Sequence, residues 1–106
     1  MRVVWSPEAQ NDLREIYLFI LQDNPYAARS LQALIKERVE HLRDNPYVGR
    51  PGRVPGTREL VISGTRYIVP YRVIGDTLHI LRIYHGARQK HRPAAALVRE
   101  AIIEYT

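Results

Sequence analysis

Apolar residues recur at helical spacing in two neighbouring stretches of the first half of the chain. The first stripe consists of Ala9, Leu13, Ile16, Tyr17, Ile20 and Leu21, and the second of Ala28, Leu31, Ile35, Val39 and Leu42. Such spacing places each set on one face of an α-helix. Both stretches open with a capping side chain followed by proline, Ser6-Pro7 and Asn24-Pro25, which is typical of a helix start. Because the break between them is short, the pattern predicts an antiparallel helical hairpin.

A second pattern, in which apolar and polar residues alternate, predicts strands before and after this hairpin. The alternating segments are residues 1–5, 57–62, 66–74 and 77–85. The last three are separated by the turn-like dipeptides Ser63-Gly64 and Gly75-Asp76, so we expect a three-stranded antiparallel meander. Pro70 lies inside the middle strand and lacks a backbone donor, so we expect a local bulge or an unpaired position there.

The remaining segments are a loop and a terminal helix. Residues 45–56 contain three prolines and three glycines and are expected to form a loop. Pro93 opens a terminal helix that either closes the core or contributes to function; its apolar face holds Val98, Ala101, Ile102 and Tyr105. The predicted fold class is therefore α+β in the order β-α-α-β-β-β-α, with the hairpin packed on a small, mainly antiparallel sheet. A length of 106 residues suits a single domain over residues 1–106.

The positive charge is concentrated in one part of the chain. The formal net charge is +5, but residues 49–92 hold 9 Lys/Arg against 2 Asp/Glu, a local net charge of +7. Fourteen of the 16 cationic residues are arginine, which binds phosphate and carboxylate groups in a fork. Such a segment attracts nucleic acid or an acidic protein surface. The alternative is a basic but inert solvated face.

Several functional classes are disfavoured by what the sequence lacks. The chain has no cysteine, which excludes a disulfide framework and thiolate metal ligands. His79, His85 and His91 have no carboxylate partner at a recognised ligand spacing, so we expect no metal and no cofactor. No apolar run approaches the roughly 20 residues that a membrane span needs, and the first residues do not resemble a secretory signal. We therefore expect a cytoplasmic protein without a membrane partner.

Cleavage of RNA is the chemistry that these residue types suggest. It needs a base, an acid and cations that stabilise the developing phosphorane. His85 is the candidate acid or base, Arg58, Arg82 or Arg88 the charge stabiliser, and Tyr84 a base-stacking side chain. We expect the arginines to converge on one patch with His85 and Tyr84 at its edge: Arg50, Arg53, Arg58, Arg66, Arg72, Arg82 and Arg88. The simpler alternatives are that His85 only ends a strand and that Glu59 forms a salt bridge with an arginine.

The combination of short motifs along nearly the whole chain resembles the RelE/ParE toxin superfamily. The matching segments are Trp5-Ser6-Pro7, Asp12-Leu13, Ile16-Tyr17, Asn45-Pro46, Gly49-Arg50, Arg58-Glu59-Leu60 and residues 67–73 and 80–88. The resemblance implies the toxin of a type II toxin–antitoxin system, neutralised by an antitoxin whose segment wraps its surface. RelE-like members cleave mRNA in the ribosomal A site, whereas ParE-like members inhibit DNA gyrase.

Two features of this chain favour the ParE-like branch. RelE-like nucleases typically carry a catalytic arginine three positions before the middle-strand tyrosine; relative to Tyr71 that position is Ile68. Arg66, two residues earlier on the same face, is an alternative position for this charge. The segment from His85 to Arg88 also looks ParE-like. We therefore favour a gyrase inhibitor that is not an enzyme, with an mRNA interferase as the alternative. The residues expected to bind the target or nucleic acid are Arg50, Arg53, Arg66, Arg72, Tyr84 and Arg88.

The expected antitoxin contact follows from the same two patterns. We expect an antitoxin helix to pack on the apolar stripes of the helical hairpin or on the terminal helix. Acidic antitoxin residues would then lie near the arginines and neutralise the basic segment.

Overall fold

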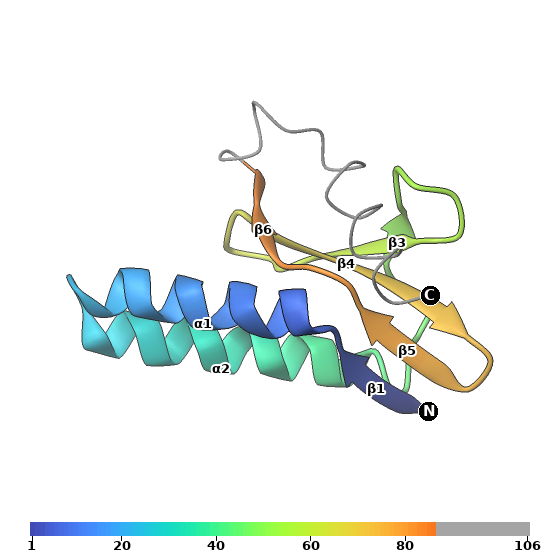
Figure 1. Ribbon diagram of the computed structural model, residues 1–106, viewed down its shortest axis with the longest axis horizontal. Helices are drawn as coiled ribbons and strands as arrows, with labels where there is room; N and C mark the ends of the chain where they lie inside the picture. The colour runs from blue at the N-terminus through green and yellow to red at the C-terminus, as the bar shows by residue number, and fades with distance from the viewer. Residues whose placement is uncertain (87–106) are drawn as a thin grey trace.

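The computed structural model describes residues 1–86, which form two helices and six strands (Figure 1). In chain order these are β1 (Arg2–Trp5), α1 (Pro7–Leu21), α2 (Pro25–His41), β2 (Arg50–Pro51), β3 (Arg58–Val61), β4 (Tyr67–Ile74), β5 (Thr77–Ile80) and β6 (Tyr84–His85). The predicted terminal helix and Arg88 lie outside the described residues.

Both helices begin where the capping residues predict. The Ser6 hydroxyl accepts a hydrogen bond from the Ala9 backbone N–H at 2.9 Å, and the Asn24 side chain accepts one from Ala27 at 3.0 Å. In each case proline occupies the first helical turn, where its missing N–H removes no hydrogen bond. The two helices pack together as the predicted hairpin, and their connecting turn projects beyond the sheet (Figure 1).

The strands form one mixed sheet in the order β1-β5-β4-β3-β2, and β6 pairs with β4 beyond the end of β5. β1 runs parallel to β5, whereas the other pairings are antiparallel. The prediction of a helical hairpin on a mainly antiparallel sheet is therefore confirmed for the described residues. The parallel pairing of β1 places the first strand at an edge of the sheet, directly before α1.

The sheet has a helix face and an outer face. Val69, Tyr71, Leu78 and Ile80 are fully buried on the helix face, in one cluster with residues of both helices such as Ile35. Cross-strand partners share a face, so the register assigns the other set to the outer face, which points away from the helices. The outer face holds Arg50, Glu59, Val61, Ile68, Pro70, Arg72, His79 and Tyr84.

The segment predicted to be a continuous loop contains a short strand. Residues 45–56 include β2, in which Arg50 is paired with Glu59 and Pro51 with Arg58. Pro51 is tolerated because β2 is an edge strand, where a missing N–H costs no ladder bond. The expectation of an uninterrupted loop was wrong because it weighed composition alone.

The last predicted strand, residues 77–85, is two strands separated by Leu81–Ile83. Pro70 of β4 accepts a hydrogen bond from the Leu81 N–H at 3.0 Å, but it has no N–H to return. The Leu81 carbonyl accepts instead from the Ser6 hydroxyl at 2.8 Å. On its other side Pro70 stays in register with Glu59, so the proline interrupts pairing without a bulge there.

Candidate functional site

Arg82, one of the three candidate catalytic residues, is held by α1. Its Nε and Nη2 atoms donate to the two carboxylate oxygens of Asp12 at 2.8 and 3.0 Å, and the Ile83 backbone N–H donates to Asp12 at 2.9 Å. The side chains of Arg82 and Asp12 are 22% and 11% exposed. Asp12 thus fixes the segment between β5 and β6, and the Arg82 fork is used within the fold.

Arg58, the second candidate, supports the loop after α2. Its Nη1 atom donates to the carbonyl oxygens of Tyr47 at 3.0 Å and Gly49 at 2.8 Å, and its guanidinium lies 5.3 Å from the centroid of the Tyr47 ring. The guanidinium is therefore engaged by two backbone carbonyls and an aromatic ring.

His85, the third candidate, lies far from Arg58. Its ring meets Tyr67 edge-on, with centroids 5.1 Å apart and an interplanar angle of 88°. His85 is opposite Tyr67 and Arg58 is opposite Tyr71, four residues further along β4. A strand rises about 3.3 Å per residue, which separates the two sites by roughly 13 Å. The described residues therefore do not bring the acid–base candidate and this cation together.

Four of the predicted arginines do lie on the outer face or beside it, namely Arg50, Arg53, Arg66 and Arg72. Arg50 donates through Nε and Nη2 to one Glu59 oxygen, at 3.1 and 2.9 Å, and the Glu59 side chain is only 4% exposed. The expected salt bridge of Glu59 is thereby confirmed. Arg53 and Arg66 are exposed and form no ion pair with any residue of the range 1–86.

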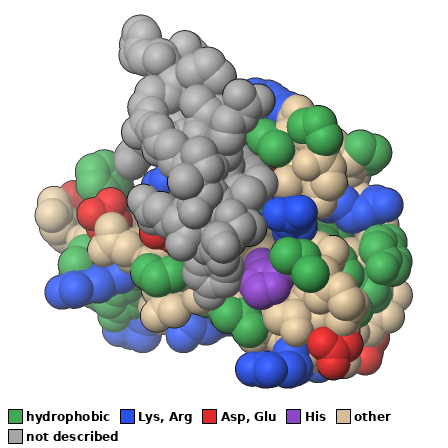
Figure 2. Space-filling model, turned by 45° about the vertical axis from the view of Figure 1, so that its right-hand side comes forward, with side chains coloured by type: hydrophobic (Ala, Val, Ile, Leu, Met, Phe, Trp, Pro, Cys, Tyr) green, Lys and Arg blue, Asp and Glu red, His purple; other side chains and the backbone are tan. Residues whose placement is uncertain are grey.

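Hydrophobic side chains separate these cations. Arg50, Arg66 and Ile68 line a hollow of about 490 Å³ together with Val61 and Gly86. On the face shown in Figure 2, Lys and Arg side chains are likewise interspersed with hydrophobic ones. The outer face is thus a mixed cationic and apolar surface, at whose centre lies the buried carboxylate of Glu59.

Tyr84 is buried on the outer face. The residue is 5% exposed, and its hydroxyl has no hydrogen-bond partner among the described residues. Burial raises the pKa of Tyr84, the nearby Glu59 carboxylate raises it further, and Arg53 and Arg50 act in the opposite direction. The phenol therefore stays protonated near neutral pH, and the covered ring offers little surface for stacking on a nucleic-acid base.

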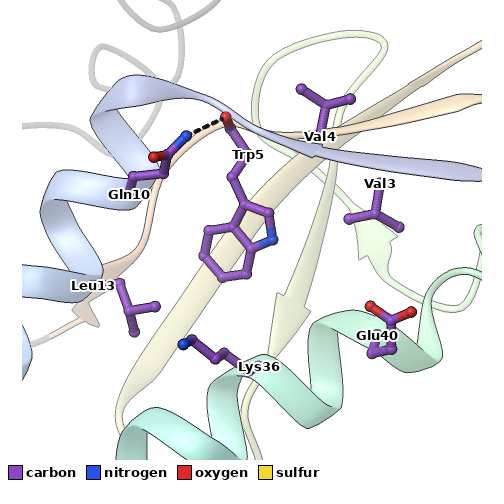
Figure 3. A pocket seen from close by; sticks show the side chains of 7 residues that line it. All are labelled: Val3, Val4, Trp5, Gln10, Leu13, Lys36 and Glu40. Carbon is purple, nitrogen blue, oxygen red and sulfur yellow. Dashed lines mark hydrogen bonds between the residues drawn. The ribbon is translucent and has the colours of Figure 1, made fainter.

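Another groove lies at the β1 edge, and no pattern in the sequence pointed to it. Its volume is about 640 Å³, and Val3, Val4, Trp5, Gln10, Leu13, Lys36 and Glu40 line it (Figure 3). The Trp5 indole and Leu13 form its apolar part, and Gln10 donates to the Trp5 carbonyl at 3.0 Å. Trp5 was recognised only as part of a family-like motif; the groove exists because β1 is an edge strand.

The backbone of β1 is partly open along this groove. The backbone N–H groups of Arg2 and Ser6 donate to the carbonyls of Asp76 and Ile80 at 2.9 Å each. Because backbone groups alternate in direction along a strand, those of Val3 point the other way, to the side on which the sheet has no further described strand.

The described residues also show neither a metal-binding cluster nor a membrane-spanning helix. Among residues 1–86, no three His, Asp or Glu side chains lie close enough together to hold a metal ion. Within the same range, neither helix is long and apolar enough to cross a membrane.

Comparison with known proteins places the chain in a family. Residues 3–90 match the family model of the ParE toxin of the type II toxin–antitoxin system parDE. A putative toxin, Y4kP, of Sinorhizobium fredii is 41% identical over 88 residues, which cover 83% of this chain and 91% of the relative. Toxin RelE1 of Caulobacter vibrioides is 31% identical over 90 residues, covering 83% and 96% of the two chains.

Solved structures agree with this assignment. A chain of the chromosomal ParDE system from P. aeruginosa superposes with a TM-score of 0.74 at 34% identity, covering 80% of this chain and 95% of the other. A chain of the RelBE2 toxin–antitoxin complex from Mycobacterium tuberculosis gives a TM-score of 0.60 at 28% identity, with coverage of 79% and 95%. The chain therefore belongs to the ParE toxin family of type II toxin–antitoxin systems.

Proposed function

We propose that this toxin arrests bacterial growth by binding and inhibiting DNA gyrase in the cytoplasm, and that it is not a ribonuclease. The observation that carries the proposal is that each candidate catalytic residue contacts other parts of the fold and that Arg58 lies apart from His85. Arg82 is paired with Asp12, Arg58 binds loop carbonyls, and His85 lies against Tyr67. Concerted acid–base cleavage needs these groups within hydrogen-bond reach of one phosphate.

The electrostatics of the outer face support the same proposal. A phosphodiester on this face would meet the Arg50–Glu59 ion pair and not an unpaired arginine, because Arg50 already donates to the buried Glu59 carboxylate. Tyr84 remains protonated there and is a poor general base. Ile68 stands where the resemblance to RelE-like nucleases calls for an arginine. By contrast, exposed Arg53 and Arg66 beside apolar residues suit an acidic protein surface.

The deciding experiment compares two assays on the purified toxin. We expect gyrase supercoiling to fall with toxin concentration while mRNA on translating ribosomes stays intact. The double variant Arg53→Ala/Arg66→Ala should raise the half-inhibitory concentration by about tenfold, because it removes two interface cations. The matched control is Arg14→Ala/Arg29→Ala, which removes two exposed helix arginines. Unchanged supercoiling at excess toxin, together with codon-positioned mRNA cuts, would establish the nuclease instead.

We further propose that a cognate antitoxin occupies the β1-edge groove. Both solved relatives described above come from toxin–antitoxin systems. The second apolar stripe of the hairpin offers little surface for this contact, because its residues Ile35, Val39 and Leu42 are buried in the core. The groove instead offers Trp5, and Lys36 at its rim gives a cation for an acidic segment.

The antitoxin contact is tested by charge reversal at the rim of the groove. Lys36→Glu should weaken antitoxin binding in calorimetry by about fivefold, and more at low salt. Arg29→Glu, an equal charge reversal on the exposed surface of the same helix, should change it by less than about twofold. Equal effects of the two variants would remove the groove from the proposal.

A further inference from the structure

The loop of residues 45–50, between α2 and β2, is fixed from beneath by buried groups. The hydroxyl of Tyr71, which is fully buried, accepts from the Gly49 N–H at 2.9 Å and donates to the Pro46 carbonyl at 2.8 Å. Arg58 adds its bonds to the carbonyls of Tyr47 and Gly49. Four hydrogen bonds from Tyr71 and Arg58 thus hold a segment that its composition alone would leave variable.

Gly49 is required at this position by the close approach of Tyr71. A Cβ atom on Gly49 would lie 2.5 Å from the Tyr71 hydroxyl oxygen, a distance that real side chains do not adopt. The backbone of the loop therefore sits directly on the buried phenol. A loop held this closely loses little conformational entropy when it binds a partner.

The same loop presents two large apolar side chains to solvent. Tyr47 is 63% exposed and Val48 is 67% exposed. The Tyr47 ring rests on the Arg58 guanidinium, which restrains the ring without covering it. Scattered apolar residues on a surface are ordinary, but adjacent ones on a fixed loop form a preorganised anchor.

Arginines lie in contact with this anchor and shortly after it in the chain. Arg50 follows Val48 by two residues and, although paired with Glu59, keeps 52% of its side chain exposed. Arg53 is exposed and Arg58 is partly exposed. Aromatic residues and arginine are the types enriched where binding energy concentrates in protein interfaces. The fitting partner surface is an apolar depression bordered by acidic side chains.

We propose that Tyr47 and Val48 form the apolar anchor through which this toxin grips its protein target, with Arg50 and Arg53 meeting acidic residues around the point of insertion. The inference rests on the proposed function in taking that target to be gyrase. A protein fits better than a single-stranded nucleic acid, because Val48 gains nothing from base stacking and needs an apolar pocket. The anchor is separate from the β1-edge groove, so target and antitoxin use different residues.

The test is the double variant Tyr47→Ser/Val48→Ser, measured for gyrase inhibition, antitoxin affinity and thermal melting. We expect the half-inhibitory concentration to rise by about 30-fold or more, the loss typical of a central anchor. Antitoxin affinity should stay within about threefold and melting should be unchanged, since both side chains are exposed. Tyr47→Phe keeps the ring and should inhibit like the wild type. Tyr26→Ser removes another exposed tyrosine, 75% accessible at the start of α2, and serves as the matched control.

Three outcomes would overturn the anchor. The first is inhibition by the double variant within about threefold of the wild type, well below the loss expected of a central anchor. The second is a parallel loss of antitoxin affinity or melting temperature, and the third is a loss of affinity for a labelled single-stranded oligonucleotide that matches the loss of inhibition.

Growth arrest tests the anchor of Tyr47 and Val48 independently of which protein is the target. If the wild type leaves gyrase unaffected, the proposed function fails, and the anchor is judged by growth arrest at equal expression. A double variant that still arrests growth then refutes the anchor, whereas one that is harmless but still binds antitoxin supports it.

Discussion

Replacing Asp12 by alanine should destabilise this toxin more than any other single change to a charged residue of α1. The carboxylate accepts three hydrogen bonds, two from Arg82 and one from the Ile83 N–H. Its removal takes from the largely buried Arg82 guanidinium the counter-charge that Asp12 supplies, and the Ile83 donor loses its acceptor. Breaking one partner of a buried pair costs about 3–5 kcal/mol.

The expected magnitude is slightly lower because water reaches part of the pair. With side chains 22% and 11% exposed, solvation recovers some of the loss, so we expect about 3 kcal/mol. For an m value of about 1.5 kcal/mol/M, typical of a small protein in urea, this lowers the unfolding midpoint by about 2 M. Circular dichroism during urea titration at neutral pH measures it directly.

Two variants define the comparison. Asp12→Asn keeps one oxygen for the Ile83 N–H but no charge, so its free energy of unfolding should lie between those of the wild type and Asp12→Ala. Glu15→Ala removes an exposed carboxylate of the same helix that, within residues 1–86, accepts only from the Asn11 side chain, and should cost less than about 0.5 kcal/mol. If Asp12→Ala unfolded at the same urea concentration as Glu15→Ala, the assignment of Asp12 as the support of residues 81–83 would be refuted. An Arg82→Ala variant that loses toxicity must be judged by the same titration before any role in catalysis is assigned to Arg82.

Three further predictions concern the buried groups near the loop and the outer face. Gly49→Ala should cost at least about 2 kcal/mol in urea unfolding, because its Cβ would overlap the Tyr71 hydroxyl; a stability equal to wild type would contradict the close packing. Tyr84→Phe should leave the free energy of unfolding unchanged or raise it by up to about 1 kcal/mol, since the Tyr84 hydroxyl has no partner among the described residues. A destabilised variant would reveal a hydrogen-bond partner of this hydroxyl. Burial raises the pKa of both Tyr71 and Tyr84, so the stability they contribute is fully present below the unfolded-state pKa of about 10 and is lost as pH rises through the higher folded value. Ultraviolet titration of the folded protein should therefore show that Tyr71 and Tyr84 ionise above the ordinary tyrosine pKa of about 10. Ionisation of either one at or below that value would disprove the prediction.

Local signals were sufficient to predict the helices and most of the strands. Ser6 and Asn24 each cap a helix through their own side chains, and the alternation over residues 66–74 marks β4. The break after β5 depends on contacts that no local pattern contains. Asp12 lies 70 residues from Arg82, and only the folded chain brings this carboxylate next to the Ile83 N–H.

The candidate site was predictable in composition but not in arrangement. Alternation correctly assigned Ile68 and Arg72 to one face of β4, and Arg66, directly before this strand, lines the same hollow as Ile68. It also predicted that Glu59 would pair with an arginine, because few carboxylates lie near the basic segment. The functions of Arg58 and Arg82 depend on partners in other elements, and the groove beside Trp5 depends on the parallel pairing of β1. Tertiary contacts of this kind cannot be predicted from the periodicity of apolar and polar residues.

The fold divides the positive charge of the chain into two groups with different functions. Within residues 49–86, Arg50, Arg58 and Arg82 are bound to a carboxylate or to backbone carbonyls, whereas the other three arginines of that range form no ion pair with a described residue. The first group holds β2, the loop of residues 45–50 and the segment before β6 in place. The second group and the exposed part of the Arg50 side chain can face a partner, and dispersed cations of this kind give long-range attraction more than affinity. Tight and selective binding must then come from apolar contact, and on this part of the surface Tyr47 and Val48, beside the charges, are placed to make it.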